Sequence, residues 1–189
     1  MPCRLSITLI GPFLATGINA CTPAASTQDD AIRTVRIYDL LRAYPRAELN
    51  VQNPRYVSRD GFSVNDEVRP GVFLQSAGSV VFPPVRVSPE SVLTFKIGLI
   101  DTAWDQSDGV QFQVTVLRMS GAATEVFSRF LDPKHNADDR RWIDEKVSLR
   151  QFGDQDVRVI LATLPGPAGD YTCDWGVFAE PQIVLGPAK

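Results

Sequence analysis

The sequence is poor in the residue types on which most catalytic and metal sites depend. Its 189 residues include one histidine and three cysteines, and its 19 lysines and arginines are outnumbered by 22 acidic residues. The net charge of −3 and the pI of about 5.2 argue against a general nucleic-acid binder, because phosphate contacts need a basic surface. No segment after the N-terminal stretch approaches the ~20 apolar residues that a membrane-spanning helix needs.

Motifs of the common catalytic centres are also missing from the sequence. A Ser-His-Asp arrangement would have to use His135, which lies in the strongly polar stretch 133–136. No G-x-S-x-G turn precedes a predicted helix, and no glycine-rich phosphate loop occurs. Acidic residues could supply the carboxylate pair of a glycoside hydrolase, but nothing in the sequence selects two of them. We therefore expect a protein that is not an enzyme, with a hydrolase as the less favoured alternative.

The first 20 residues resemble an export signal. Arg4 precedes a mostly apolar stretch over 5–15, and the small residues that end at Ala20 predict cleavage before Cys21. The sequence Ile18-Asn19-Ala20-Cys21 is similar to a bacterial lipobox, in which the cysteine becomes a lipidated N-terminus. We favour lipidation of Cys21 over plain secretion or an uncleaved start. We therefore expect an exported protein of the cell envelope, whose only membrane contact is an N-terminal lipid.

The rest of the sequence predicts a tether followed by one domain. Residues 21–30 are small and polar and predict a flexible tether, and residues 31–189 are enough for a single domain with its own core. Cys173 is left as a lone thiol that we expect to be buried or inert, although plain secretion would allow it to pair with Cys21.

Apolar periodicity predicts one helix followed by strands. Residues 29–42 show near-helical spacing and precede Pro45, which stops a helix. Beyond Pro45 the period is two, and Asp60-Gly61 predicts a tight turn between strands 55–58 and 62–68. Clearer strands are expected over 92–100, 110–117, 124–131, 143–149, 157–164 and 177–185. The sequence therefore predicts an all-β fold, an antiparallel two-sheet sandwich with one short N-terminal helix.

Alternation of strand direction predicts that three polar loops share one end of this sandwich. If each consecutive strand reverses, residues 101–109, 132–142 and 165–176 all lie at that end. The three loops contain Trp104, Trp142 and Trp175 together with many aspartates. This arrangement indicates a binding rim on a rigid scaffold.

Two kinds of site are candidates within this rim. Tryptophan rings can pack on the C–H faces of sugars while polar neighbours such as Asp105 bind hydroxyl groups; the alternative is that the rings plug the ends of the core. The spacing D-x3-D-x2-D of Asp101, Asp105 and Asp108 suits the oxygen ligands that calcium prefers, and the alternative is turn capping. A structural calcium ion is the one cofactor we consider.

Several stretches resemble carbohydrate-binding-module-like jelly-roll domains of bacterial surface proteins, a galactose-binding-like β-sandwich family. The similarity extends over most of 32–185 and rests on framework patterns, which are Arg36-Ile37-Tyr38-Asp39-Leu40-Leu41, Leu93-Thr94-Phe95-Lys96-Ile97-Gly98-Leu99, Trp104-Asp105, Asp108-Gly109-Val110-Gln111-Phe112, Asp139-Arg140-Arg141-Trp142, Val147-Ser148-Leu149, Asp174-Trp175-Gly176 and Pro181-Gln182-Ile183. The resemblance implies a two-sheet jelly roll and glycan binding.

These observations lead to two hypotheses of different classes. The first is a lipid-anchored cell-surface module that binds a glycan or cell-wall polysaccharide through the loops at one end, with Trp104 as the leading contact. The second is a structural or assembly lipoprotein that docks a protein partner. A sugar response would favour the first, and a co-purifying partner without a sugar response would favour the second.

Overall fold

A computed structural model of the chain describes residues 35–186. The predicted export signal, Cys21, the tether and the first part of the predicted helix lie outside the described residues. The elements in chain order are β1 (Val35–Asp39), α1 (Leu40–Ala43), η1 (Tyr44–Arg46), β2 (Glu48–Asn50), η2 (Pro54–Tyr56), β3 (Val57–Val64), β4 (Glu67–Gln75), β5 (Gly78–Val81), β6 (Val85–Val87), β7 (Ser91–Leu99), η3 (Asp101–Ala103), β8 (Val110–Arg118), β9 (Ala123–Leu131), η4 (Ala137–Asp139), β10 (Ile143–Ser148), η5 (Arg150–Phe152), β11 (Gln155–Pro165) and β12 (Trp175–Leu185).

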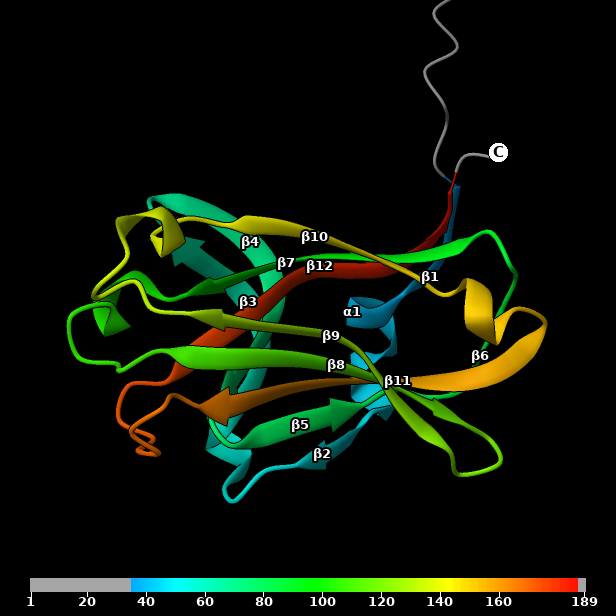
Figure 1. Cartoon of the computed structure of the whole chain (residues 1–189), viewed down its shortest axis with the longest axis horizontal. Coiled ribbons are helices and arrows are strands. Elements are labelled where there is room, and N and C mark those ends of the chain that lie inside the picture. The colour runs from blue at the N-terminus through cyan, green and yellow to red at the C-terminus, as the bar shows by residue number, and fades with distance from the viewer. Residues whose placement is uncertain (1–34, 187–189) are drawn as a thin grey trace, which may run out of the picture. The chain divides into compact units, whose positions relative to one another are not determined.

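The strands form two antiparallel sheets packed face to face (Figure 1). Sheet A has the order β10-β7-β12-β4-β3, with β1 also paired to β12. Sheet B has the order β2-β5-β11-β8-β9, with β6 also paired to β11. The predicted all-β sandwich with one short helix is confirmed. No helix within residues 35–186 is long and apolar enough to cross a membrane.

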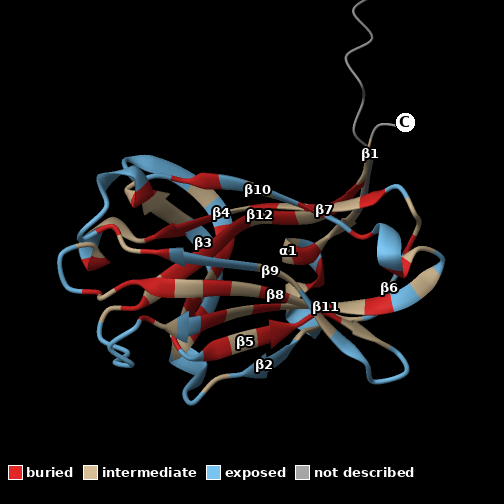
Figure 2. Ribbon diagram, viewed as in Figure 1, coloured by how far each residue is buried: buried red, intermediate tan, exposed pale blue. Residues whose placement is uncertain are grey.

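Alternation of apolar and polar residues sets which side of each strand faces the core. In β7, residues 93, 95, 97 and 99 are buried, and in β8 the same is true of residues 110, 112, 114 and 116. Figure 2 shows this as buried segments that alternate with lighter ones along both strands. A side-chain period of two places such residues on one face of a strand, so the two clearest strand predictions are confirmed.

Aromatic rings join the two sheets across the core. Phe178 of β12 lies 5.2 Å from Phe112 of β8 and 5.7 Å from Phe95 of β7, measured between ring centroids. Phe127 of β9 meets Phe95 edge to face at 5.1 Å. Rings of this kind bury large apolar areas and prefer edge-to-face or tilted contacts. These contacts tie the middle of sheet A to sheet B beneath the loops that follow β7 and β11.

A second apolar cluster covers the outer face of sheet A. Val177 and Ala179 flank Phe178 in β12 and therefore point away from the core between the sheets. They pack with Val64 and with Trp142, which arrives from the loop before β10. This cluster fixes the loop 132–142 against sheet A.

The predicted helix over 29–42 is wrong for residues 35–39, which form β1. The first half of β12 pairs with β4 through residues 175–179, and the second half pairs with β1 through residues 182–185. Beyond the reach of β4, β1 supplies the backbone partners that β12 would otherwise lack. Helix α1 is only the four residues that follow, capped by Asp39, whose carboxylate accepts a hydrogen bond from the Arg42 amide.

The predicted turn at Asp60-Gly61 is also wrong. Both residues continue β3, opposite Gly71 and Pro70 of β4. The hairpin turns instead at Asn65-Asp66, whose φ angles are 53° and 63°. A two-residue turn with both φ angles positive matches the twist of the two strands, and asparagine and aspartate tolerate this conformation.

Candidate functional site

Three connections meet at one end of the sandwich, on the left in Figure 1. They are residues 100–109 after β7, 132–142 after β9 and 166–174 after β11. The reversal of direction at each step follows from the antiparallel pairing of β7 with β10 and β12 and of β8 with β9 and β11. The predicted convergence of the loops is therefore confirmed. We call this region the loop end.

Asp101 fastens the first loop to the β3–β4 hairpin. Its Oδ1 atom accepts a hydrogen bond from the Asn65 amide at 2.6 Å, and its Oδ2 atom accepts one from the Ser63 hydroxyl at 3.1 Å. A carboxylate bound by two donors forms comparatively strong hydrogen bonds. Asp101 therefore has a structural role as the anchor of the turn.

Trp104, Asp105 and Arg140 form a small exposed group. The Trp104 ring is half-buried, and its Nε1 atom donates to the Leu99 carbonyl at 2.9 Å. The Arg140 guanidinium lies 5.4 Å from the Trp104 ring centroid, and its Nη2 atom is 3.4 Å from Asp105 Oδ1. A cation over an indole is an attractive arrangement. One part of the Trp104 ring is therefore covered by a charged group, while the Asp105 side chain is 89% exposed.

Two further aspartates, Asp108 and Asp174, join the first loop to the third. Asp174 is fully buried, and its Oδ1 atom accepts a hydrogen bond from the Ser107 hydroxyl at 2.7 Å. Asp108 Oδ2 accepts one from the Ala168 amide at 3.1 Å. Asp108 Oδ1 and Asp174 Oδ2 are buried without a hydrogen-bond partner among the described residues. The hydrogen bonds hold the two loops together, while the two unpaired oxygen atoms lower the stability of the folded state.

Burial raises the pKa of Asp174 from its ordinary value of 3.8 to about 6. The Ser107 hydroxyl opposes this by stabilising the carboxylate, the negative charges of Asp108 and Asp170 raise the pKa further, and the Gly166 backbone N–H lowers it. Desolvation disfavours the charged form of a carboxyl group, as do nearby charges of the same sign. Asp174 therefore changes its protonation state near pH 6.

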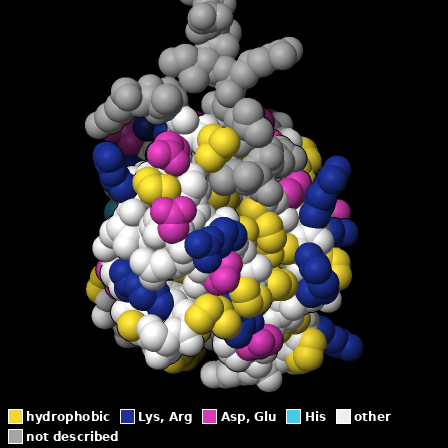
Figure 3. All heavy atoms as spheres, turned by 90° about the vertical axis from the view of Figure 1, so that its right-hand side faces the viewer, with side chains coloured by type: hydrophobic (Ala, Val, Ile, Leu, Met, Phe, Trp, Pro, Cys, Tyr) yellow, Lys and Arg dark blue, Asp and Glu magenta, His cyan; other side chains and the backbone are white. Residues whose placement is uncertain are grey.

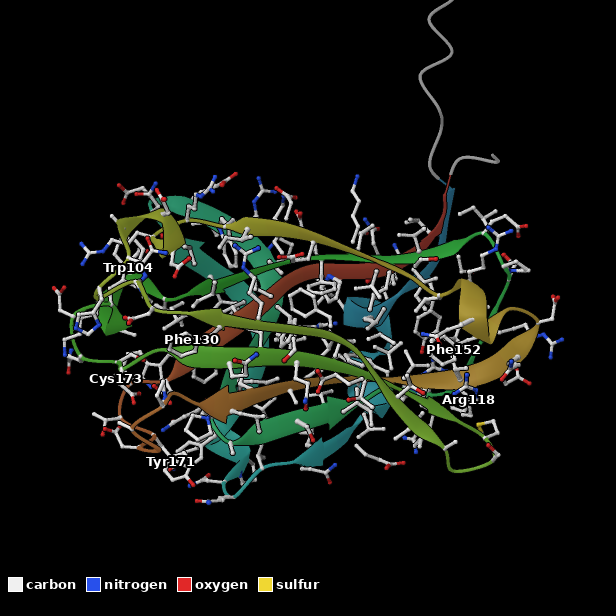
Figure 4. All side chains as sticks on the ribbon, in the orientation of Figure 1. Trp104, Arg118, Phe130, Phe152, Tyr171 and Cys173 are labelled. Carbon is white, nitrogen blue, oxygen red and sulfur yellow. The ribbon has the colours of Figure 1, made fainter. Side chains whose placement is uncertain are left out.

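The three tryptophans differ in burial and in their contacts, and Trp104 packs against the apolar cluster that contains Trp142. Trp142 is 7% exposed, packs on Gly98 of β7 and donates from Nε1 to the Glu67 carbonyl at 2.8 Å. Trp175 is half-buried at the start of β12, opposite Gln75 of β4. Trp104 lies in the loop after β7, at the position labelled in Figure 4. The Trp142 ring packs on the outer face of sheet A, and the ligand contacts expected of the three tryptophans stay predictions.

The aspartates of the predicted calcium set do not converge. Asp101 binds the β3–β4 turn, Asp105 faces Arg140, and Asp108 binds the third loop. Within residues 35–186, no three side chains of His, Cys, Asp or Glu are grouped as metal ligands. Of the three, only Asp101 lies in the 3-10 turn η3, and Asp105 and Asp108 follow it, so each carboxylate contacts a different neighbour.

Sequence reasoning missed a hollow at the loop end of sheet B. It has a volume of about 280 Å³ and is lined by Gln111, Phe130, Leu164, Pro165, Gly166 and Pro167. Phe130 and Leu164 are each 37% exposed, and both line this hollow, so two large apolar side chains gather at one place on the surface. The sequence leaves the buried face of 124–131 ambiguous, so the outward position of Phe130 could not be recognised. We call this feature the Phe130 hollow.

The opposite end of the sandwich has a different chemistry. Figure 3 looks onto this end and shows lysine and arginine interspersed with acidic and hydrophobic side chains. A hollow of about 320 Å³ here is lined by charged residues of both signs, among them Arg86, Arg118, Asp154 and Asp156. The Arg118 guanidinium lies 4.5 Å from the centroid of the buried Phe152 ring, in the region labelled in Figure 4. No residue that lines the Phe130 hollow is charged.

Comparison with known proteins gives one sequence relative and several similar structures. No protein-family model matches the sequence. An uncharacterised protein of Archaeoglobus fulgidus is 39% identical over 106 residues, which is 55% of this chain and 26% of the relative. The chain thus spans about a quarter of the length of the curated relative it matches.

Two solved structures share the fold across most of the chain. The first is a CBM51 domain from Clostridium perfringens GH95 in complex with methyl-galactose, at 12% identity with a TM-score of 0.54, covering 80% of this chain and 99% of that one. The second is the K3 cleaved adhesin domain of Lys-gingipain from Porphyromonas gingivalis W83, at 11% identity with a TM-score of 0.52, covering 82% and 100%. The chain therefore has the two-sheet fold of carbohydrate-binding modules.

Proposed function

We propose that this domain is an exported binding module that recognises a glycan, such as a cell-wall polysaccharide, at the loop end. The observation that carries the proposal is the fixation of this end by hydrogen bonds between loops, above all the buried bond of Ser107 with Asp174 and the bond of Asp108 with Ala168. The similar CBM51 domain that was solved with methyl-galactose supports the ligand class.

Fixed loops favour the binding of sugars for a physical reason. A sugar offers many hydroxyl groups, whose desolvation is repaid only by polar partners that are already in place. Asp105 and Arg140 offer exposed charged groups on neighbouring loops, held beside the Trp104 ring. Because these side chains are already held in place, binding does not incur the entropic cost of ordering them.

The proposal is tested by a glycan array followed by calorimetry with methyl-galactose and with soluble cell-wall polysaccharides. We expect saturable binding by the described domain and weaker binding by Asp105→Asn, which removes the charge facing Arg140. Asp156→Asn, an exposed acid at the opposite end, is the matched control and should bind as the wild type does. No binding to any sugar, together with a protein that co-purifies, would favour the docking alternative.

We also propose that the module is anchored through lipid on Cys21. The support is the lipobox-like sequence that ends at this cysteine. Mass spectrometry of the protein from its native envelope should find an acylated cysteine as the first residue. A mature N-terminus at Cys21 without acyl chains would show plain secretion and refute the lipid anchor.

A further inference from the structure

We infer that the Phe130 hollow is a subsite for one uncharged pyranose ring, which stacks on Phe130 and Leu164 and is held by the amide of Gln111. This inference rests on the proposed function and gives it a location and a ligand class. The hollow lies at the loop end, where Figure 4 labels Phe130 on the same side of the molecule as Trp104 and Tyr171.

The register of sheet B builds the floor of the hollow. Phe130 of β9 is the direct partner of Gln111 in β8, and Gln111 is the direct partner of Leu164 in β11. Side chains at directly opposed positions of neighbouring strands project from the same face of a sheet. The three side chains therefore form one row across the outer face of sheet B, with the amide between two apolar groups.

Close backbone packing fixes the Phe130 ring. Gly109 has a φ angle of 103°, and a Cβ atom added there would lie 2.3 Å from Cζ of Phe130. The ring thus rests on bare backbone at a position where a side chain would displace it. A ring held in this way loses little side-chain entropy when a ligand packs against its open face.

The wall of the hollow is also rigid. Pro165 and Pro167 flank Gly166, where an added Cβ atom would come within 2.8 Å of the Asp108 and Gly109 carbonyl oxygens. The Ala168 amide is bound by Asp108, so the segment is held on both sides of Pro167. Proline rings limit backbone freedom further. The wall is therefore formed before any ligand arrives.

The chemistry of the lining matches a sugar ring better than a charged ligand. Gln111 Nε2 donates to the Ser128 hydroxyl at 2.8 Å, which orients the amide, and its Oε1 atom accepts no hydrogen bond from the described residues. A pyranose presents an apolar C–H face and peripheral hydroxyl groups, which fit the apolar side chains and the amide oxygen. The volume of about 280 Å³ lies near the lower end for small-molecule pockets, as a single ring requires.

The test is an NMR titration of the isotope-labelled domain with methyl glycosides of galactose, glucose, xylose and mannose. We expect at least one glycoside to shift the Gln111 side-chain amide and the Phe130 ring signals in a saturable way. Phe130→Ala should weaken the affinity by about tenfold, the usual value of one good aromatic contact. Leu164→Ala should weaken it by a few-fold, whereas Leu49→Ala, a leucine of similar exposure in β2, should leave it unchanged.

The outcomes separate the subsite from the proposed function. Binding by wild type that survives both Phe130→Ala and Leu164→Ala, with shifts near Trp104 instead, overturns the subsite and leaves glycan binding standing. Binding of proline-rich peptides at the hollow without any sugar response overturns both proposals. Amide spectra of the variants that match the wild type outside the hollow show that the fold is retained, so a lost affinity is a loss of contact.

Discussion

Replacement of Asp174 by asparagine should stabilise the protein above pH 6. The folded state raises the pKa of this carboxyl from 3.8 to about 6, chiefly by burial. A raised carboxyl pKa means that the folded state holds the Asp174 proton more tightly than the unfolded state does. The protonated carboxyl therefore makes its full contribution to stability below pH ~4, and this contribution is lost as pH rises through ~6. A shift of about 2 pKa units, at about 1.4 kcal/mol each, corresponds to about 3 kcal/mol.

Asparagine has nearly the shape of the protonated side chain and carries no charge. Its amide oxygen can accept the hydrogen bond from Ser107, and its amino group is a donor at the position of Oδ2, which has no partner among the described residues. The variant should therefore escape the cost of burying a charge at neutral pH, while below pH 4 it should resemble the wild type.

Urea unfolding between pH 4 and pH 8, in EDTA to exclude metal ions, measures the effect. The difference in unfolding free energy between Asp174→Asn and wild type should grow with pH by about 2 kcal/mol across this range, because part of the effect lies below pH 4. Asp105→Asn, whose side chain is 89% exposed, is the control and should show little pH dependence. A difference that stays constant with pH, or a variant less stable than wild type at pH 8, would refute the reasoning.

Three further predictions follow from packing. Trp142→Phe removes the hydrogen bond to the Glu67 carbonyl and part of the ring that packs on sheet A. It should lower the unfolding free energy by about 2 kcal/mol and leave glycan affinity unchanged. A large loss of affinity at equal stability would contradict the packing role. Gly109→Ala should cost at least about 1 kcal/mol by denaturant unfolding and should shift the Phe130 ring signals, whereas an unmoved ring would contradict the contact. Asp101→Ala should cost about 1 to 3 kcal/mol and speed amide exchange in the β3–β4 turn, and unchanged exchange there would rule out its anchoring role.

Much of the fold could be predicted because strand periodicity is a local property. The buried positions of β7 and β8 follow from alternation along nine residues each, and that pattern requires no knowledge of partners. Reversal of direction between consecutive strands then placed the three polar loops at one end. Of the seven strands that follow Pro84, the six that carry these loops, β7 to β12, were predicted, and the three-residue β6 was not.

Segments whose structure depends on a distant partner could not be predicted. Residues 35–39 have helical spacing, yet they form β1 because the second half of β12 needs a backbone partner. The turn at Asn65-Asp66 was overlooked in favour of Asp60-Gly61, because both pairs favour turns and only the pairing with β4 decides between them. Tertiary contacts here outweigh local preference.

The candidate site shows the same division. The sequence by itself determined an alternating antiparallel sandwich whose tryptophans and aspartates gather at one end, since side-chain period and chain reversal act residue by residue. Only the tertiary structure decided that Trp142 packs on Gly98, that the aspartates bind separate neighbours, and that Phe130, Gln111 and Leu164 share one row. Register between strands far apart in the chain sets these neighbours, because cross-strand contacts depend on how entire faces pack.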